Sequence, residues 1–172
     1  MQKICLVLFT VINLSGFAQK GNNKLIAKYE DTLKLIAHTI MNAETEAEKR
    51  LANIAFITKL TEVLKYEKSF KFPFDSLPTI ARISSPDNTF RIFNWILKKD
   101  NGCYEYNAIV HFQNKNRKRY EIIPLIDNSA NIRNANQEDL DATNWYGALY
   151  YQIAYIKKLA ENTTLYLVGM GM

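Results

Sequence analysis

The chain has 172 residues, of which 48% are hydrophobic, and this is enough for one domain to bury a core without disulfide staples. It carries 22 Lys and Arg against 17 Asp and Glu, a net charge of +5 that is only mildly basic. Much of the excess falls where turns or strand ends are expected. We therefore favour a solvated rim that discourages strand pairing over a nucleic-acid surface, and expect no nucleic-acid partner.

The first 18 residues have the pattern of a secretory signal peptide. Lys3 precedes an apolar run from Ile4 to Leu14, and the small residue Ala18 comes before Gln19. The run is too short to span a bilayer, and Cys5 lies inside it rather than after a lipobox. We expect cleavage after Ala18, no transmembrane segment in the mature chain, and an exported protein that is periplasmic or extracellular. Residues 19–172 are then predicted to form a single domain.

Two helices are predicted between residues 23 and 67. In the first, residues 23–41, an apolar stripe recurs every three or four positions, and Glu30 and His38 lie on the solvent side. The stripe consists of Leu25, Tyr29, Leu33, Ile36 and Ile40.

The second helix, residues 43–66, begins with a capping box of Thr45 and Glu48. The acidic residues of its first turns suit the positive end of the helix dipole, so we do not interpret them as metal ligands. Its predicted stripe is Ala47, Leu51, Ile54, Leu60 and Leu64. An extended connector is expected to follow, because Phe70, Phe72 and Phe74 alternate with other residues until prolines interrupt.

From residue 79 to residue 169 the pattern is that of antiparallel strands. Two strands flank a polar turn at Ser84–Asn88, and two more cover residues 103–113 and 119–126. Residues 128–144 are predicted to be a long loop, and residues 145–159 and 164–172 a final hairpin. The expected fold class is α+β, with two N-terminal helices packed on a C-terminal antiparallel sheet, a meander of about five to seven strands.

The strand at residues 90–97 is apolar on both faces, so both must be covered. One face carries Arg91, Phe93, Trp95 and Leu97, and the other carries Phe90, Ile92, Asn94 and Ile96. The helices can cover one face, while strand curvature, the long loop or a partner must cover the other. Trp95 is predicted to anchor the core, with its indole N–H bonded to a carbonyl.

The search for chemistry gives no catalytic or metal motif. Cys103 and His111 would lie about 27 Å apart along one strand, too far for a nucleophile and its base. A lone thiol in an oxidising compartment is more often buried than reactive, and both alternatives stay open for Cys103. We expect His111 to be a satisfied sheet histidine. The loop containing Asn134, Asn136, Glu138, Asp139 and Asp141 lacks the glycine of a calcium loop. Asp87 and Glu105 could meet across strands as in glycoside hydrolases, but Asp87 is explained as a turn residue.

The sequences SSPDNTFRIFNW and WYGALYY resemble a group of uncharacterised exported proteins from Bacteroidetes. The resemblance covers about residues 74–169, and its motifs look structural rather than catalytic. It implies no activity and no cofactor. Relatives of this kind continue past a Leu-Leu-Gly-like strand into further strands, whereas this chain reads LVGMGM, which suggests truncation of the fold.

Two interpretations of function remain. The first is a non-catalytic binding or structural domain of the cell envelope, and the alternative is a hydrolase of an extracellular polymer or envelope component. The residues assigned to a partner or ligand surface are Asp87, Arg91, Trp95, His111, Trp145 and Tyr146. No cofactor or metal is expected, and the partner would be a protein or envelope component. The apolar segment Leu165–Val168 is further expected to leave an open strand edge that supports self-association.

Overall fold

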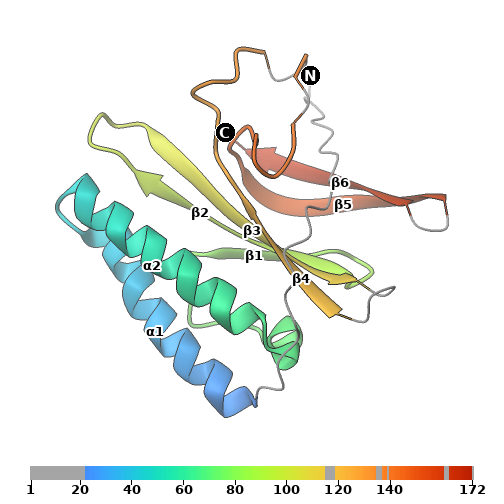
Figure 1. The fold of residues 1–172 in the computed structure, drawn as a ribbon, viewed down its shortest axis with the longest axis horizontal. Coiled ribbons are helices and arrows are strands. Elements are labelled where there is room, and N and C mark those ends of the chain that lie inside the picture. The colour runs from blue at the N-terminus through green and yellow to red at the C-terminus, as the bar shows by residue number, and fades with distance from the viewer. Residues whose placement is uncertain (1–21, 115–118, 135–136, 139, 161–162, 172) are drawn as a thin grey trace.

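The computed structural model describes residues 22–114, 119–134, 137–138, 140–160 and 163–171, with backbone alone from residue 154 onward. The predicted signal peptide lies outside these residues. The fold is α+β, as predicted: two helices come first and antiparallel strands follow (Figure 1). The elements are α1 (Asn23–Asn42), α2 (Glu46–Leu64), the 3₁₀ helix η1 (Glu67–Lys71), β1 (Ala81–Ser84), β2 (Phe90–Lys98), β3 (Tyr104–Asn114), β4 (Arg119–Leu125), β5 (Leu149–Ala160) and β6 (Thr163–Gly171).

Side chains cap the first turn of both helices. The Asn22 side chain accepts a hydrogen bond from the Leu25 amide at 2.7 Å. At α2 the capping box is confirmed, because Thr45 Oγ1 accepts from the Glu48 amide while the Glu48 carboxylate accepts from the Thr45 amide. Ion pairs connect α2 to the sheet, because Arg50 contacts both Glu46 on its own helix and Glu105 on β3.

The six strands of the described residues form two sheets rather than one. The first is the meander β1-β2-β3-β4, with every neighbouring pair antiparallel, and the second is the hairpin β5-β6. The β1–β2 turn is built as expected: Asn88 has φ 53°, and the Asp87 carboxylate accepts hydrogen bonds from Ser85 and Thr89. At the β2–β3 turn Gly102 has φ 82°, a conformation that glycine adopts without strain.

The helix pair covers one face of the meander, and the main core lies between the helices and the sheet (Figure 1). Trp95 is 2% exposed and packs edge-on against Phe56, with the ring centroids 5.0 Å apart. Its indole Nε1–H donates to Asn53 Oδ1 at 2.7 Å, so the anchor is confirmed and its partner is a side-chain carbonyl.

Two helix expectations were wrong. Leu51 and Ile54 are 69% and 62% exposed, because α2 turns Asn53 inward, where the indole of Trp95 and the amide of Asn107 satisfy it. Glu30, expected in solvent, is buried because its carboxylate accepts the Ser76 amide at 2.7 Å. In both cases a polar side chain is buried where it finds hydrogen-bond partners.

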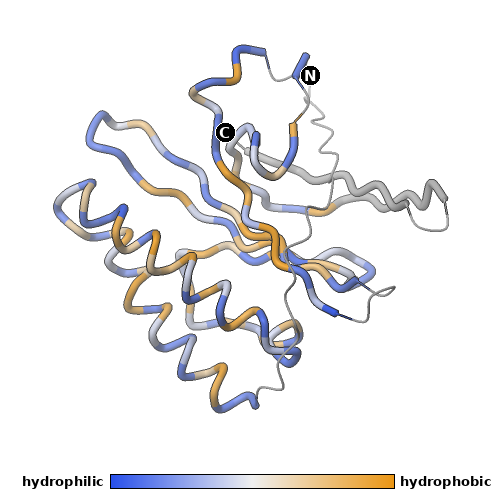
Figure 2. The backbone as a smooth tube through the Cα atoms, in the orientation of Figure 1, coloured by the Kyte–Doolittle hydropathy of each residue, from blue (hydrophilic) through white to orange (hydrophobic). Residues whose placement is uncertain are grey.

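The other face of the meander is covered by the long loop and by β5. Asp127 fixes this loop, since its carboxylate accepts the amides of Tyr106 at 2.9 Å and Ser129 at 2.9 Å. Burial alone would raise the pKa of Asp127, but these hydrogen bonds and one from Gly147 outweigh it and lower the pKa. Trp145 is buried over this face and donates to Tyr150 Oη at 2.7 Å. Figure 2 shows that the central strands between the two layers are mostly hydrophobic.

Residues 67–71 differ from the extended connector that was expected. They form η1, whose end is marked by the Phe72 amide donating to the Ser69 carbonyl at 3.0 Å. The alternation of phenylalanines there does not mark a strand, because Phe70 lies in η1 while Phe72 and Phe74 follow it. This element forms one wall of the groove described below.

Candidate functional site

The structure does not gather the six residues assigned to a partner surface. Arg91, Trp95, His111 and Trp145 are all less than 10% exposed, so they lie inside the molecule. Trp95 faces the helices, whereas Trp145 lies on the opposite side of the sheet. Asp87 is exposed at the β1–β2 turn and Tyr146 is half-buried in the loop before β5. Only Arg91 and His111 meet, as paired residues across β2 and β3.

Arg91 and His111 form a buried basic pair among aromatic rings. An Nη atom of Arg91 lies 3.5 Å from His111 Nδ1, and the guanidinium lies over Phe93 and Phe74 at 4.7 and 5.2 Å from the ring centroids. Burial lowers the pKa of Arg91 to about 9, with repulsion from Arg82 contributing less, and the side chain remains charged at neutral pH.

The pKa of His111 lies well below the usual value. Burial is the main cause and the charge of Arg91 adds to it, while the Leu64 carbonyl acts in the opposite direction. Its Nε2 makes no hydrogen bond to the described residues, so the expected satisfied histidine is only half satisfied. The ring is neutral at pH 7 and packs against Phe70 at 5.0 Å and Tyr120 at 5.6 Å.

Arg91 sets the position of η1. Its guanidinium donates to the carbonyl of Phe72 at 2.7 Å and to the carbonyl of Ser69. Ser69 is itself buried, and its hydroxyl donates to the Leu64 carbonyl at 3.2 Å. A buried charged donor that satisfies two carbonyls at the end of a short helix holds that backbone firmly.

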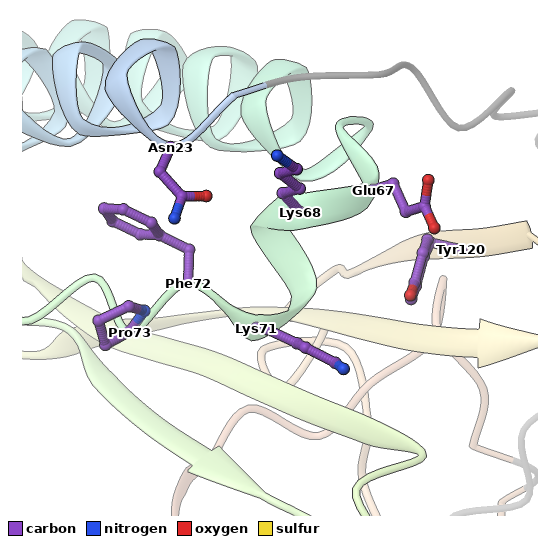
Figure 3. A pocket seen from close by; sticks show the side chains of 7 residues that line it. All are labelled: Asn23, Glu67, Lys68, Lys71, Phe72, Pro73 and Tyr120. Atoms are coloured by element: carbon purple, nitrogen blue, oxygen red, sulfur yellow. The ribbon is translucent and has the colours of Figure 1, made fainter.

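On the outer side of this fixed backbone lies a groove of about 530 Å³, within the size range of small-molecule sites of ~300–1,000 Å³. Figure 3 shows Phe72 and Asn23 at one end and Tyr120 and Glu67 at the other, with Lys68 and Lys71 from η1 between them. We call it the η1 groove. Its lining residues are Asn23, Glu67, Lys68, Lys71, Phe72, Pro73 and Tyr120.

The polar side chains of the η1 groove are uncommitted. Lys68, Lys71 and Glu67 make no hydrogen bond or ion pair with another described residue, in contrast to the paired charges of Arg50 and Glu46 at the other end of α2. Lys68 and Lys71 both line the groove from η1, and Figure 3 shows their side chains pointing in different directions.

The aromatic rings of the groove are half-buried and supported from behind. Tyr120 stacks on Phe70 with centroids 4.9 Å apart, and Phe72 packs edge-on against Phe74 at 5.0 Å. Burial raises the pKa of Tyr120, and the nearby charge of Glu67 raises it further, so the phenol stays a hydrogen-bond donor at neutral pH. The groove therefore offers rings, ammonium groups, one carboxylate and one amide on a fixed frame.

The groups considered for catalysis do not converge. Cys103 is exposed at the β2–β3 turn, so of the two alternatives its thiol is not the buried one. Asp87 lies in the β1–β2 turn, where its carboxylate accepts hydrogen bonds from Ser85 and Thr89. His111 is buried in the core. In the described ranges no three His, Cys, Asp or Glu side chains lie close enough to hold a metal ion. Within the same ranges no helix has the length and apolarity to cross a membrane.

Sequence reasoning missed the η1 groove. The sequence signal for the groove was the pair Lys68 and Lys71 next to Phe72. These residues line one groove only because residues 67–71 form a 3₁₀ helix. Arg91, assigned to a surface, turned out to position the groove from below. Tyr120 could not be linked to Lys68 from the sequence, because 52 positions separate them and the packing of β4 against η1 brings them into one groove.

Comparison with family models, with curated proteins and with solved structures finds no match for this chain. The resemblance to exported proteins of Bacteroidetes stays an expectation from the sequence.

Proposed function

We propose that this protein is an exported, non-catalytic binding domain of the cell envelope, and that the η1 groove is its binding site. The observation that carries the proposal is the contrast between a rigid frame and free side chains. Arg91 holds the carbonyls of Ser69 and Phe72, while Lys68 and Lys71 have no partner among the described residues. A preorganised backbone with uncommitted polar groups lowers the ordering cost of binding.

The alternative function, hydrolysis of an extracellular polymer, has less support. A hydrolase of the retaining or inverting kind places two carboxyl groups on either side of the scissile bond. The η1 groove contains one carboxylate, that of Glu67. The scatter of Cys103, Asp87 and His111 favours binding over catalysis for the same reason.

The test is co-sedimentation of the purified mature protein with insoluble envelope polysaccharide, combined with an assay for released soluble sugars. A binding domain is expected to sediment with the polymer and release nothing over hours. Lys68→Ala with Lys71→Ala should abolish sedimentation, whereas Lys28→Ala with Lys34→Ala removes the same charge from the exposed side of α1 and should not. Release of reducing ends would support the hydrolase instead.

Export and self-association are part of the same proposal. The apolar start of the chain supports export, and N-terminal sequencing of the protein from the extracytoplasmic fraction should begin at Gln19. Self-association is supported by β6, which pairs with β5 in a two-stranded sheet and has no other described strand beside it. The side chains of Leu165–Val168 lie outside the described part, so this support comes from the backbone and the sequence.

A further inference from the structure

We infer that the ligand of the η1 groove is an acidic saccharide, a chain of two or three pyranose rings that carries carboxylate groups. The inference rests on the proposed binding function and names its ligand class. It follows from the arrangement of three kinds of group along the groove: rings at the two ends, ammonium groups between them, and hydrogen-bonding side chains beside the rings.

The first step concerns the rings. Phe72 and Tyr120 lie at opposite ends of the groove in Figure 3, and each is half-buried with a second ring behind it. The remaining exposed ring surface is flat, apolar and fixed in place, and the C–H face of a pyranose suits such a surface. Two such surfaces at separate places fit a ligand that repeats along its length better than a compact one.

The second step concerns charge. Lys68 and Lys71 both line the groove from η1, and neither has a counter-ion among the described residues. Figure 3 shows their ammonium groups apart, on different sides of η1, so each can form a charge-assisted hydrogen bond to a separate carboxylate of one ligand. The middle of the groove therefore selects for a negative group.

The third step concerns the hydroxyl groups of a sugar. Glu67 lies next to Tyr120 at one end and Asn23 next to Phe72 at the other. A carboxylate accepts hydrogen bonds from hydroxyls, an amide both donates and accepts, and the Tyr120 phenol remains a donor. Glu67 also repels a second anion at its end, so the acidic group of the ligand is directed toward the lysines. A bare inorganic anion would use the lysines alone.

The experiment uses a matched pair of ligands on the mature protein. Cellotriose and its C6-oxidised counterpart, a β-1,4-linked triglucuronate, share linkage and length and differ in the carboxylates. We expect calorimetry at low salt to show binding of the triglucuronate about tenfold tighter than cellotriose, and sodium phosphate to bind more weakly than either. Raising the salt to about 0.5 M should reduce the preference, because the ammonium groups are exposed.

Variants separate the contributions. Lys68→Ala with Lys71→Ala should remove the preference for the acidic trisaccharide, while the charge-matched pair Lys28→Ala with Lys34→Ala should keep it. Phe72→Leu, which keeps apolar bulk at a half-buried position, should weaken both sugars about equally. Thermal melts of each variant confirm that it is folded.

The outcomes distinguish the inference from the function it rests on. Equal affinity for both trisaccharides at the groove, or phosphate binding as tightly as triglucuronate, would overturn the ligand class while leaving a binding groove in place. A preference that survives in Lys68→Ala with Lys71→Ala would move the acidic contact elsewhere and also overturn it. No binding of either sugar, together with no sedimentation with envelope polysaccharide, would overturn both.

Discussion

Replacing Trp95 by phenylalanine isolates the hydrogen bond that joins the sheet to α2. The smaller ring can still pack against Phe56, but it cannot donate to Asn53 Oδ1, which accepts the indole N–H at 2.7 Å. Asn53 is 5% exposed, so water cannot replace the lost donor. The same asparagine donates to Asn107 Oδ1 at 2.8 Å, and that bond is retained.

The loss of unfolding free energy that we expect for Trp95→Phe has two contributions. An unsatisfied buried acceptor costs ~1–3 kcal/mol. The smaller buried area of the phenylalanine ring adds roughly 1 kcal/mol. We therefore expect Trp95→Phe to lower the free energy of unfolding by about 2–4 kcal/mol, and Trp95→Ala to lower it by about 3–5 kcal/mol through the cavity it leaves.

Urea unfolding followed by circular dichroism measures these losses, and a double-mutant cycle identifies their origin. With Asn53→Ala as the second change, the double variant should be more stable than the sum predicts by ~1–2 kcal/mol, since the bond is lost only once. Leu51→Ala, on the exposed side of the same helix, should cost less than ~0.5 kcal/mol. A loss below about 1 kcal/mol for Trp95→Ala would refute the buried anchor.

Three further outcomes are expected. Burial depresses the pKa of His111, so below pH ~6.5 the unfolded chain takes up a proton that the folded protein does not. The free energy of unfolding should therefore fall by ~1.4 kcal/mol per pH unit below that point, and His111→Phe should remove this slope. Gly147→Ala should cost ~1–3 kcal/mol in denaturant melts, because a Cβ there would lie 2.6 Å from the hydrogen-bonded carboxylate of Asp127; a neutral effect would show that the loop can yield. Sedimentation velocity should show concentration-dependent association through β6, whereas a monomer at millimolar concentration with slow amide exchange in β6 would contradict the open edge.

The sequence predicted the fold where local chemistry decides it. The capping box at Thr45 and the polar turn around Asn88 specify their own geometry within a few residues, so the start of α2 and the first hairpin could be placed. The two-faced character of β2 also required a second layer, and the long loop with Trp145 supplies it.

The features that the sequence did not predict depend on contacts between residues that are distant in the chain. Asn53 and Glu30 are buried because of Trp95 and Ser76, which no helical pattern can reveal. Counting apolar positions therefore placed Leu60 and Leu64 correctly in the core but assigned Leu51 and Ile54 to it wrongly. The groove was missed for a similar reason, since the conformation of residues 67–72 is stabilised by Arg91, which lies 22 and 19 positions after the two carbonyls that it holds.

The groove itself is tested most directly by amide chemical-shift mapping of the mature protein during titration with triglucuronate. The account predicts that the resonances of Asn23, Lys68, Lys71 and Tyr120 shift together with a single dissociation constant, and that residues of the outer side of α1 do not move. Shifts confined to other parts of the surface, or no saturable shift at these four residues, would contradict the claim that this protein binds its ligand in the η1 groove.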